Sequence, residues 1–157
     1  MKRLALAMLC AACGGSTGLQ GSLGSDVSLA YTTVLIQSTP SVIGVSFETP
    51  TPGQSGEDIV LKVTATTSGL DLTKPLTIDL TTLVSGAQRG SVVRVVSGDG
   101  RGDLPTIQRG TLAFDSAPTA GKTVSGTLNI LFAAGSAFAS GRTVFGDFSA
   151  LITVPGQ

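Results

Sequence analysis

The segment Asp58-Ile-Val-Leu-Lys-Val-Thr-Ala-Thr66 indicates the fold class of this 157-residue chain. Its odd-numbered residues from Ile59 to Ala65 are apolar, whereas Lys62, Thr64 and Thr66 are polar. Successive side chains of a strand point to opposite faces of a sheet. The period of two therefore predicts a β-strand with one buried face and one solvent-facing face.

The same pattern recurs along the chain between turn-forming clusters of Gly, Pro, Ser and Asp. Further strands are predicted at residues 28–37, 42–49, 76–81, 91–97, 110–115, 122–133 and 142–154. No stretch of useful length has the apolar spacing of an amphipathic helix. We therefore expect residues 26–157 to form one all-β domain of about eight strands, an antiparallel β-sandwich or, alternatively, a small β-barrel.

The last two predicted strands nearly repeat each other, because residues 123–132 align with residues 143–152 at an offset of twenty. Each strand carries a valine, a glycine and a large apolar residue on one face. These are Val124, Gly126 and Leu128 in the first strand, and Val144, Gly146 and Phe148 in the second. Glycines at matching strand positions predict a shared curvature or a bulky neighbour that covers them.

The first residues differ in composition from the β domain. Lys2 and Arg3 are followed by an apolar stretch, Leu4 to Ala12, that is too short to span a bilayer, which takes about 20 helical residues. Small residues then precede Cys13. This arrangement predicts a cleaved secretory signal peptide over residues 1–12.

The segment Leu9-Cys10-Ala11-Ala12-Cys13-Gly14-Gly15-Ser16 resembles the lipobox of small bacterial lipoproteins, although Cys10 stands where that family usually has Leu. The resemblance implies that Cys13 becomes the N-terminus, is acylated, and holds the protein on the bacterial cell envelope. Gly14 in place of an Asp implies the outer membrane. The alternatives are a secreted or periplasmic protein, an uncleaved anchor, or a redox or zinc role for the pair Cys10 and Cys13.

Residues 13–25 contain five glycines, no charge before Asp26 and no apolar periodicity. This composition predicts a flexible tether between the lipid anchor and the domain.

Composition narrows the function. The chain has no His and no Trp, which removes His-based catalytic triads and most zinc chemistry, and makes stacking platforms for sugars or bases unlikely. From Cys13 onward eight basic residues face ten acidic ones, so no basic footprint for nucleic acid exists. The carboxylates are scattered, and no nucleophile has the spacing of a catalytic dyad. We expect neither catalysis nor a cofactor nor a metal.

The loop Ser97-Gly-Asp-Gly-Arg-Gly-Asp-Leu-Pro105 is the one stretch that suggests a ligand. Asp99 and Asp103, with backbone carbonyls, are candidates for a weak cation site, although the further acidic ligands of an EF-hand are missing. The tripeptide Arg101-Gly102-Asp103 matches a short integrin-recognition motif. A solvent-exposed connection between two strands is the simpler interpretation.

Two hypotheses for function follow from these features. In the first, the protein is a membrane-anchored, non-catalytic lipoprotein that acts as a structural or interaction module toward an envelope protein or surface ligand. In the second, the strands close around an apolar cavity and carry a small ligand. Phe114, Phe132 and Phe148 would then line a pocket.

Overall fold

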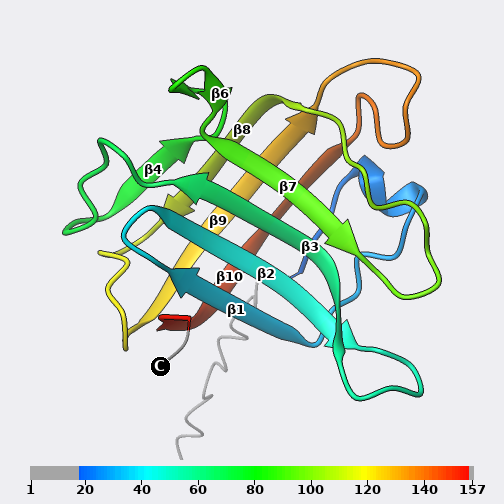
Figure 1. Cartoon of the computed structure of the whole chain (residues 1–157), viewed down its shortest axis with the longest axis horizontal. Helices are drawn as coiled ribbons and strands as arrows, with labels where there is room; N and C mark the ends of the chain where they lie inside the picture. The colour runs from blue at the N-terminus through cyan, green and yellow to red at the C-terminus, as the bar shows by residue number, and fades with distance from the viewer. Residues whose placement is uncertain (1–17, 156–157) are drawn as a thin grey trace, which may run out of the picture.

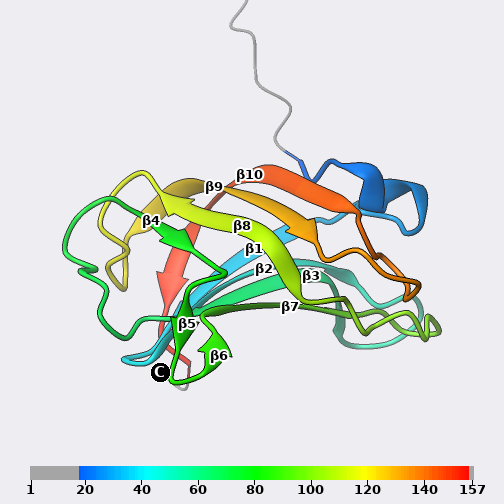
Figure 2. The ribbon, with the colours of Figure 1, turned by 90° about the horizontal axis from the view of Figure 1, so that it is seen from above.

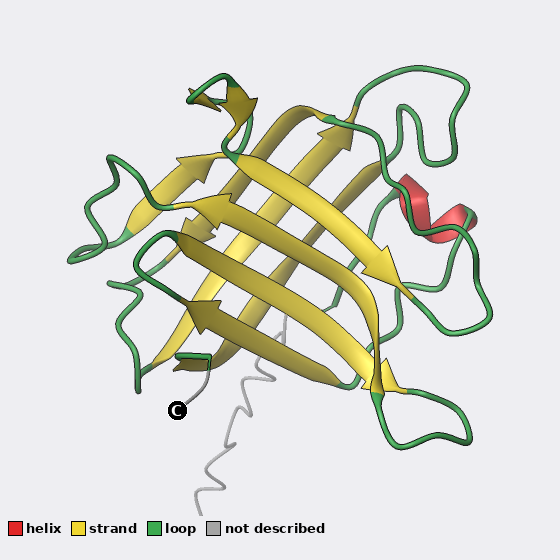
Figure 3. Ribbon diagram, in the orientation of Figure 1, coloured by secondary structure: helices red, strands yellow, loops and turns green. Residues whose placement is uncertain are grey.

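The computed structural model describes residues 18–155; the predicted signal peptide of residues 1–12 and the predicted acylation site Cys13 lie outside the described residues. Within them the fold is all-β, with one large sheet, a small hairpin and a short 3-10 helix (Figures 1 and 3). The elements are η1 (Ser22–Ser25), β1 (Thr33–Ser38), β2 (Val42–Pro50), β3 (Glu57–Thr66), β4 (Leu76–Asp79), β5 (Leu83–Val84), β6 (Ala87–Gln88), β7 (Gly90–Val95), β8 (Ile107–Phe114), β9 (Thr123–Phe132) and β10 (Thr143–Thr153).

The all-β prediction is confirmed, and each of the eight predicted strands is present in the large sheet. The largest difference is at β1, which begins at Thr33 instead of residue 28. Alternation of buried and exposed residues is regular along β7 and β9, as the period of two requires. The hairpin β5–β6 was not predicted.

The large sheet has the strand order β4-β8-β9-β10-β1-β2-β3-β7 and folds back on itself. Strands β1, β2, β3 and β7 cross over β8, β9 and β10, so that two layers face each other (Figures 1 and 2). Neighbouring strands are antiparallel except β1 and β10, which run parallel with Ile36 beside Ile152. The sheet is therefore mixed, and its two edges approach each other to give a nearly barrel-shaped domain.

Leu80 directly follows the edge strand β4 and links this side of the sheet to the opposite edge strand, β7. Its N–H donates to the carbonyl oxygen of Gly110 in β8 at 2.9 Å, and its carbonyl oxygen accepts from the N–H of Gly90 in β7 at 2.8 Å. The side chain is fully buried, and a Cβ added at Gly90 would lie 2.6 Å from the Leu80 Cβ. The two glycines therefore let Leu80 occupy the seam between β7 and β8.

The β5–β6 hairpin presents a second link across this seam. Its turn residues Ser85 and Gly86 both have positive φ, at 51° and 85°, as a type I′ turn requires. The side chain of Gln88 forms two hydrogen bonds with the backbone of Ile107 in β8. Its Nε2 donates to the Ile107 carbonyl oxygen at 2.8 Å, and its Oε1 accepts from the Ile107 N–H at 3.3 Å. Ile107 pairs with Phe132 of β9 on one side, and β4 pairs with β8 only from Thr111 to Phe114, so the amide of Gln88 supplies hydrogen bonds to Ile107 that β4 does not.

The core lies between the two layers and is apolar. It includes Phe114, Phe132 and Phe148, each at most 4% exposed, and the Phe114 and Phe148 rings meet edge to face with centroids 5.5 Å apart. All three phenylalanines proposed for a ligand pocket therefore belong to the packed interior. Within residues 18–155 no helix is long and apolar enough to cross a membrane.

The repeated strands β9 and β10 pair with each other, and their antiparallel register places each glycine opposite a large residue. Gly126 lies opposite Phe148, and Gly146 lies opposite Leu128. A Cβ added at Gly126 would meet the Ala113 carbonyl oxygen and lie 2.5 Å from Cζ of Phe148. The prediction of a bulky neighbour is thus confirmed at Gly126.

Residues 18–25, named here the N-terminal segment, pack on the domain, although their glycine content predicted a flexible tether. Gln20 and Phe145 form an antiparallel bridge in which each backbone N–H donates to the other residue's carbonyl oxygen, at 2.8 and 2.9 Å. Leu19 is 8% exposed and Leu23 is fully buried. Residues 18–25 are therefore part of the folded domain, which was predicted to begin at Asp26.

The docking of this segment can be tested at Gly21, whose φ is +124° and whose added Cβ would meet the Thr143 carbonyl oxygen. We expect Gly21→Ala to speed hydrogen exchange at the amides of Gln20 and Phe145 by about tenfold or more, because the segment must open more often. The control is Gly24→Ala, where the nearest atom to an added Cβ is 3.5 Å away on Leu29. Equal exchange in the two variants would contradict the docking.

Candidate functional site

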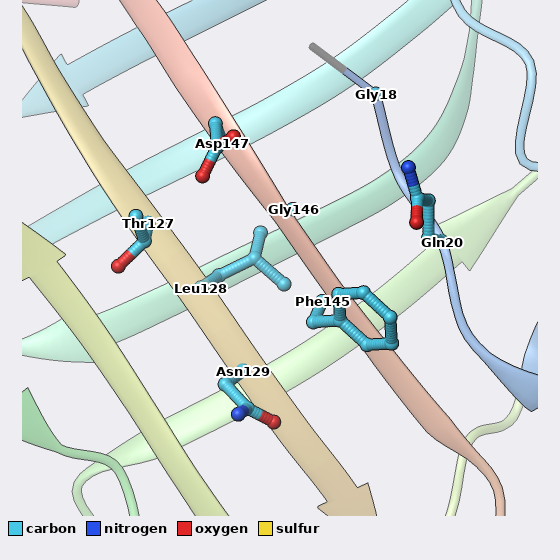
Figure 4. Close-up of a pocket in the computed structure, with 8 residues that line it drawn as sticks. All are labelled: Gly18, Gln20, Thr127, Leu128, Asn129, Phe145, Gly146 and Asp147. Atoms are coloured by element: carbon cyan, nitrogen blue, oxygen red, sulfur yellow. The ribbon is translucent and has the colours of Figure 1, made fainter. Parts of the chain in front are cut away.

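A groove of about 410 Å³ lies on the outer face of β9 and β10, beside the N-terminal segment (Figure 4). Because the strands are antiparallel and in register, Phe145 stands next to Asn129, and Asp147 stands next to Thr127. Alternation exposes these four side chains, since their neighbours in each strand face the core. The residues lining this β10 groove are Gly18, Gln20, Thr127, Leu128, Asn129, Phe145, Gly146 and Asp147.

The N-terminal segment forms one wall of the β10 groove. Its backbone occupies the edge of β10 that β1 leaves free, since β1 pairs with β10 at Ile36 and Gln37. Gly146 permits this approach, because a Cβ there would lie 2.7 Å from the carbonyl oxygen of Gly18. The groove therefore exists only while the segment is docked.

The chemistry of the β10 groove suits binding better than catalysis. The lining includes the hydroxyl of Thr127, the amides of Asn129 and Gln20, and the ring of Phe145, which is 43% exposed. Asp147 is the only titratable side chain among the lining residues, so the groove lacks a paired acid and base. The sequence pattern did not single out these residues, because their proximity depends on strand register and on the docked segment.

A second opening of about 430 Å³ lies where β1 diverges from β10, and is named here the β1–β10 opening. Tyr31, Val34 and Phe148 contribute its apolar surface, and Asp147 lies at its rim. Burial, with a smaller contribution from the negative charge of Asp147, raises the pKa of Tyr31. The Tyr31 ring also meets Phe47 edge to face, with centroids 4.9 Å apart. Of the three phenylalanines in the carrier hypothesis, only Phe148 lines this opening.

The predicted cation loop places its two carboxylates in different surroundings. Asp99 is held by two guanidinium groups: Arg101 binds both oxygens at 2.8 and 3.0 Å, and Arg94 Nη1 lies 2.9 Å from Oδ2. Asp103 is exposed. Arg94 and Arg101 already neutralise Asp99, so these contacts do not favour the predicted cation site. No cluster of three or more metal-ligating Asp, Glu, Cys or His side chains occurs within residues 18–155.

Arg101 and Asp26 join the loop to the N-terminal part of the domain. Arg101 Nη1 donates to the Asp26 carbonyl oxygen at 2.7 Å, and its guanidinium lies 5.8 Å from the ring centroid of Phe138. The Asp26 carboxylate accepts two hydrogen bonds from Arg142, at 2.7 and 3.0 Å. The guanidinium of the Arg-Gly-Asp tripeptide is thus engaged inside the protein.

Asp58, in β3, is a buried carboxylate that is only 5% exposed. Its Oδ1 accepts hydrogen bonds from the Thr51 hydroxyl at 2.9 Å, the Ser97 hydroxyl at 2.8 Å and the Ser97 N–H at 3.1 Å. Burial alone would raise its pKa, but the bonds from Ser97 and Thr51, with the charge of Arg94, outweigh it and lower the pKa. The hydrogen bonds of Asp58 with Ser97 therefore join β3 to the loop after β7.

The lowered pKa values of Asp58 and Asp99 make the folded state less stable as the pH falls into the acid range. Hydrogen bonds from Arg101 hold the pKa of Asp99 well below its usual range, despite partial desolvation. A lowered pKa stabilises the folded state above the unfolded value of about 3.9, and this contribution is lost as pH falls through the folded pKa. We expect Asp99→Asn to lower the urea midpoint at about pH 5 and to reduce its further fall toward about pH 2.

The control is Asp103→Asn, which removes an exposed carboxylate from the same loop and keeps the arginine contacts of Asp99. It should follow the wild-type urea midpoint at both pH values. An Asp99→Asn variant that falls as steeply with acid as the wild type would contradict the role of the Asp99 ion pairs.

Comparisons of the chain with known protein families, curated proteins and solved structures return no match. Function is therefore inferred from the residues and their geometry.

Proposed function

We propose that the chain is a non-catalytic lipoprotein of the bacterial cell envelope, held on the membrane by acyl chains on Cys13. The β domain is then a structural or interaction module, and the β10 groove is its binding surface. The single observation that carries this proposal is the leader, in which the apolar stretch Leu4 to Ala12 ends at Cys13. Gly14 after the cysteine favours the outer membrane.

The physical basis of attachment is burial of acyl chains. Each buried CH₂ contributes about 0.8 kcal/mol, so a single chain binds reversibly and two or more chains hold a protein stably. The absence of His from the sequence and the single titratable side chain in the β10 groove support a role in binding instead of chemistry.

Metabolic labelling with an alkynyl fatty acid tests the anchor. We expect the wild-type chain to take up the label and to partition with membranes, and Cys13→Ala to lose both, because the thiol that carries the acyl group is gone. Cys10→Ala is the matched control, since it removes the other cysteine of the leader. Equal labelling of wild type and Cys13→Ala would contradict the proposal.

The second candidate function is a carrier of a small apolar ligand, which the β1–β10 opening favours. Its volume of about 430 Å³ and its apolar surface from Tyr31, Val34 and Phe148 fit a small ligand. An apolar fluorescent dye titrated into the protein would bind at this opening, and Val34→Asp would weaken that binding. Unchanged dye affinity in Val34→Asp would remove the carrier hypothesis.

A further inference from the structure

We propose that the outer face of β9 and β10 lies on the lipid headgroups, with the ring of Phe145 inserted at the membrane surface. The partner is the bilayer that holds the acyl chains, so this inference rests on the lipid attachment proposed above. It adds an orientation: one layer of the domain faces the membrane and the other faces away.

The first argument is the reach of the chain. Four residues separate Cys13 from Gly18, so the Cα atoms of Cys13 and Gly18 are at most about 18 Å apart when the chain is fully extended. Gly18 itself lies against β10, with its carbonyl oxygen beside Gly146. An anchor at Cys13 therefore holds this part of β10 close to the headgroups, whatever path the intervening residues take.

The second argument is the chemistry of this face. Phe145 and Leu151, exposed by 43% and 52%, both project from the outer face of β10. Asp147 is the only charged residue in β9 and β10, and the other outward side chains between the two apolar residues are hydroxyls and an amide. An exposed ring among hydrogen-bonding groups, with Asp147 as the single charge in the two strands, suits the membrane–water interface, where apolar and polar groups meet.

The other exposed large apolar residues lie elsewhere on the molecule. Val93 and Val95 project from β7, which belongs to the opposite layer, and Leu83 lies on the β5–β6 hairpin (Figure 2). Gly18, the first described residue, lies beside Gly146 of β10, and not beside β7. Geometry therefore selects the face of Phe145 over the face of Val95.

Single tryptophans test the orientation, because the chain has none of its own. Phe145→Trp and Val95→Trp are made in the lipidated full chain and reconstituted into phosphatidylcholine vesicles with brominated acyl chains, which quench nearby tryptophan. Both positions are exposed on strands, at 43% and 61%. We expect at least about twofold stronger quenching for Phe145→Trp, because an interfacial ring lies within reach of the acyl region.

Fatty-acid labelling of the same preparations separates the two proposals. Labelled protein with equal quenching in both variants, or stronger quenching in Val95→Trp, overturns the orientation and leaves the anchor standing. Unlabelled protein overturns both. If Phe145→Trp is shielded from bromine and becomes shielded from aqueous acrylamide as protein concentration rises, a second copy covers the face and the orientation is also overturned.

Discussion

Leu80→Ala should lower the free energy of unfolding by about 2–5 kcal/mol, the cost of removing a fully buried leucine side chain. The loss should lie toward the upper end, because Leu80 fills the seam against Gly90 and Gly110 and neither glycine has a side chain that can collapse into the space. Urea unfolding, followed by far-ultraviolet circular dichroism, measures the change as a lower midpoint at similar slope.

Leu83→Ala is the matched control, since Leu83 lies three residues further along the chain and is 70% exposed. It should change stability by no more than about 0.5 kcal/mol. If the two alanine variants unfold at the same urea concentration, Leu80 does not hold the edges of the sheet together.

Gly126→Ala should be destabilising by about 3 kcal/mol or more, although it adds only one methyl group. The new Cβ would meet the Ala113 carbonyl oxygen, which belongs to the paired backbone of β8, and the ring of Phe148. A strand backbone cannot move aside without breaking its hydrogen bonds, so β8 and β9 must separate locally. The midpoint of urea or thermal unfolding measures the effect.

Gly56→Ala provides the comparison, because the only atom near its added Cβ is Oγ1 of Thr51 at 3.8 Å, an ordinary contact. This variant should unfold close to the wild type. A Gly126→Ala protein as stable as Gly56→Ala would show that β8 and β9 do not pack as closely as described.

The strands were predictable from the sequence because one face of each is buried. Alternation along 123–132 follows directly from that burial, and the observed strand agrees. In β3 the predicted alternation holds from Leu61 to Thr66, but a register shift between Ile59 and Lys62 leaves Asp58 and Val60 buried and Ile59 partly exposed. The parallel pairing of β1 with β10 was not predictable, because it joins segments more than a hundred residues apart and leaves no local pattern. The β5–β6 hairpin was missed because its strands have two residues each, too few to show alternation.

The N-terminal segment shows how composition can mislead. Its glycines are typical of a linker, yet Leu19 and Leu23 are buried, and Leu23 belongs to the 3-10 helix η1. Gly21 is required by its positive φ and by the nearby Thr143 carbonyl, so one linker-like residue is a packing residue. The two leucines among small residues were the available signal for docking.

The candidate site was less predictable than the fold. Asn129 and Phe145 are sixteen residues apart, and only the register of β9 and β10 brings them together. The sequence predicts the last two strands as a hairpin, but it does not predict the register that places Asn129 beside Phe145. The sequence predicts a cation site in the loop with Asp99 instead, because no local pattern shows that the buried Arg94 lies beside that carboxylate.

The docked segment would link the proposed anchor to the domain. A long flexible tether would let the domain take any orientation above the membrane, whereas docking from Gly18 onward leaves only four residues between Cys13 and the docked segment. The β10 groove, the exposed ring of Phe145 and the proposed membrane contact all depend on this short connection. Loss of docking in Gly21→Ala should therefore also weaken the contact of the ring with lipid.

The most direct test of the proposed attachment is the mass of the N-terminal proteolytic fragment of the protein extracted from membranes. We predict that this fragment begins at Cys13 and carries the added mass of its acyl groups, so that residues 1–12 are absent. A fragment that begins at Cys13 or elsewhere without acyl mass, or one that retains Met1, would contradict the lipoprotein proposal.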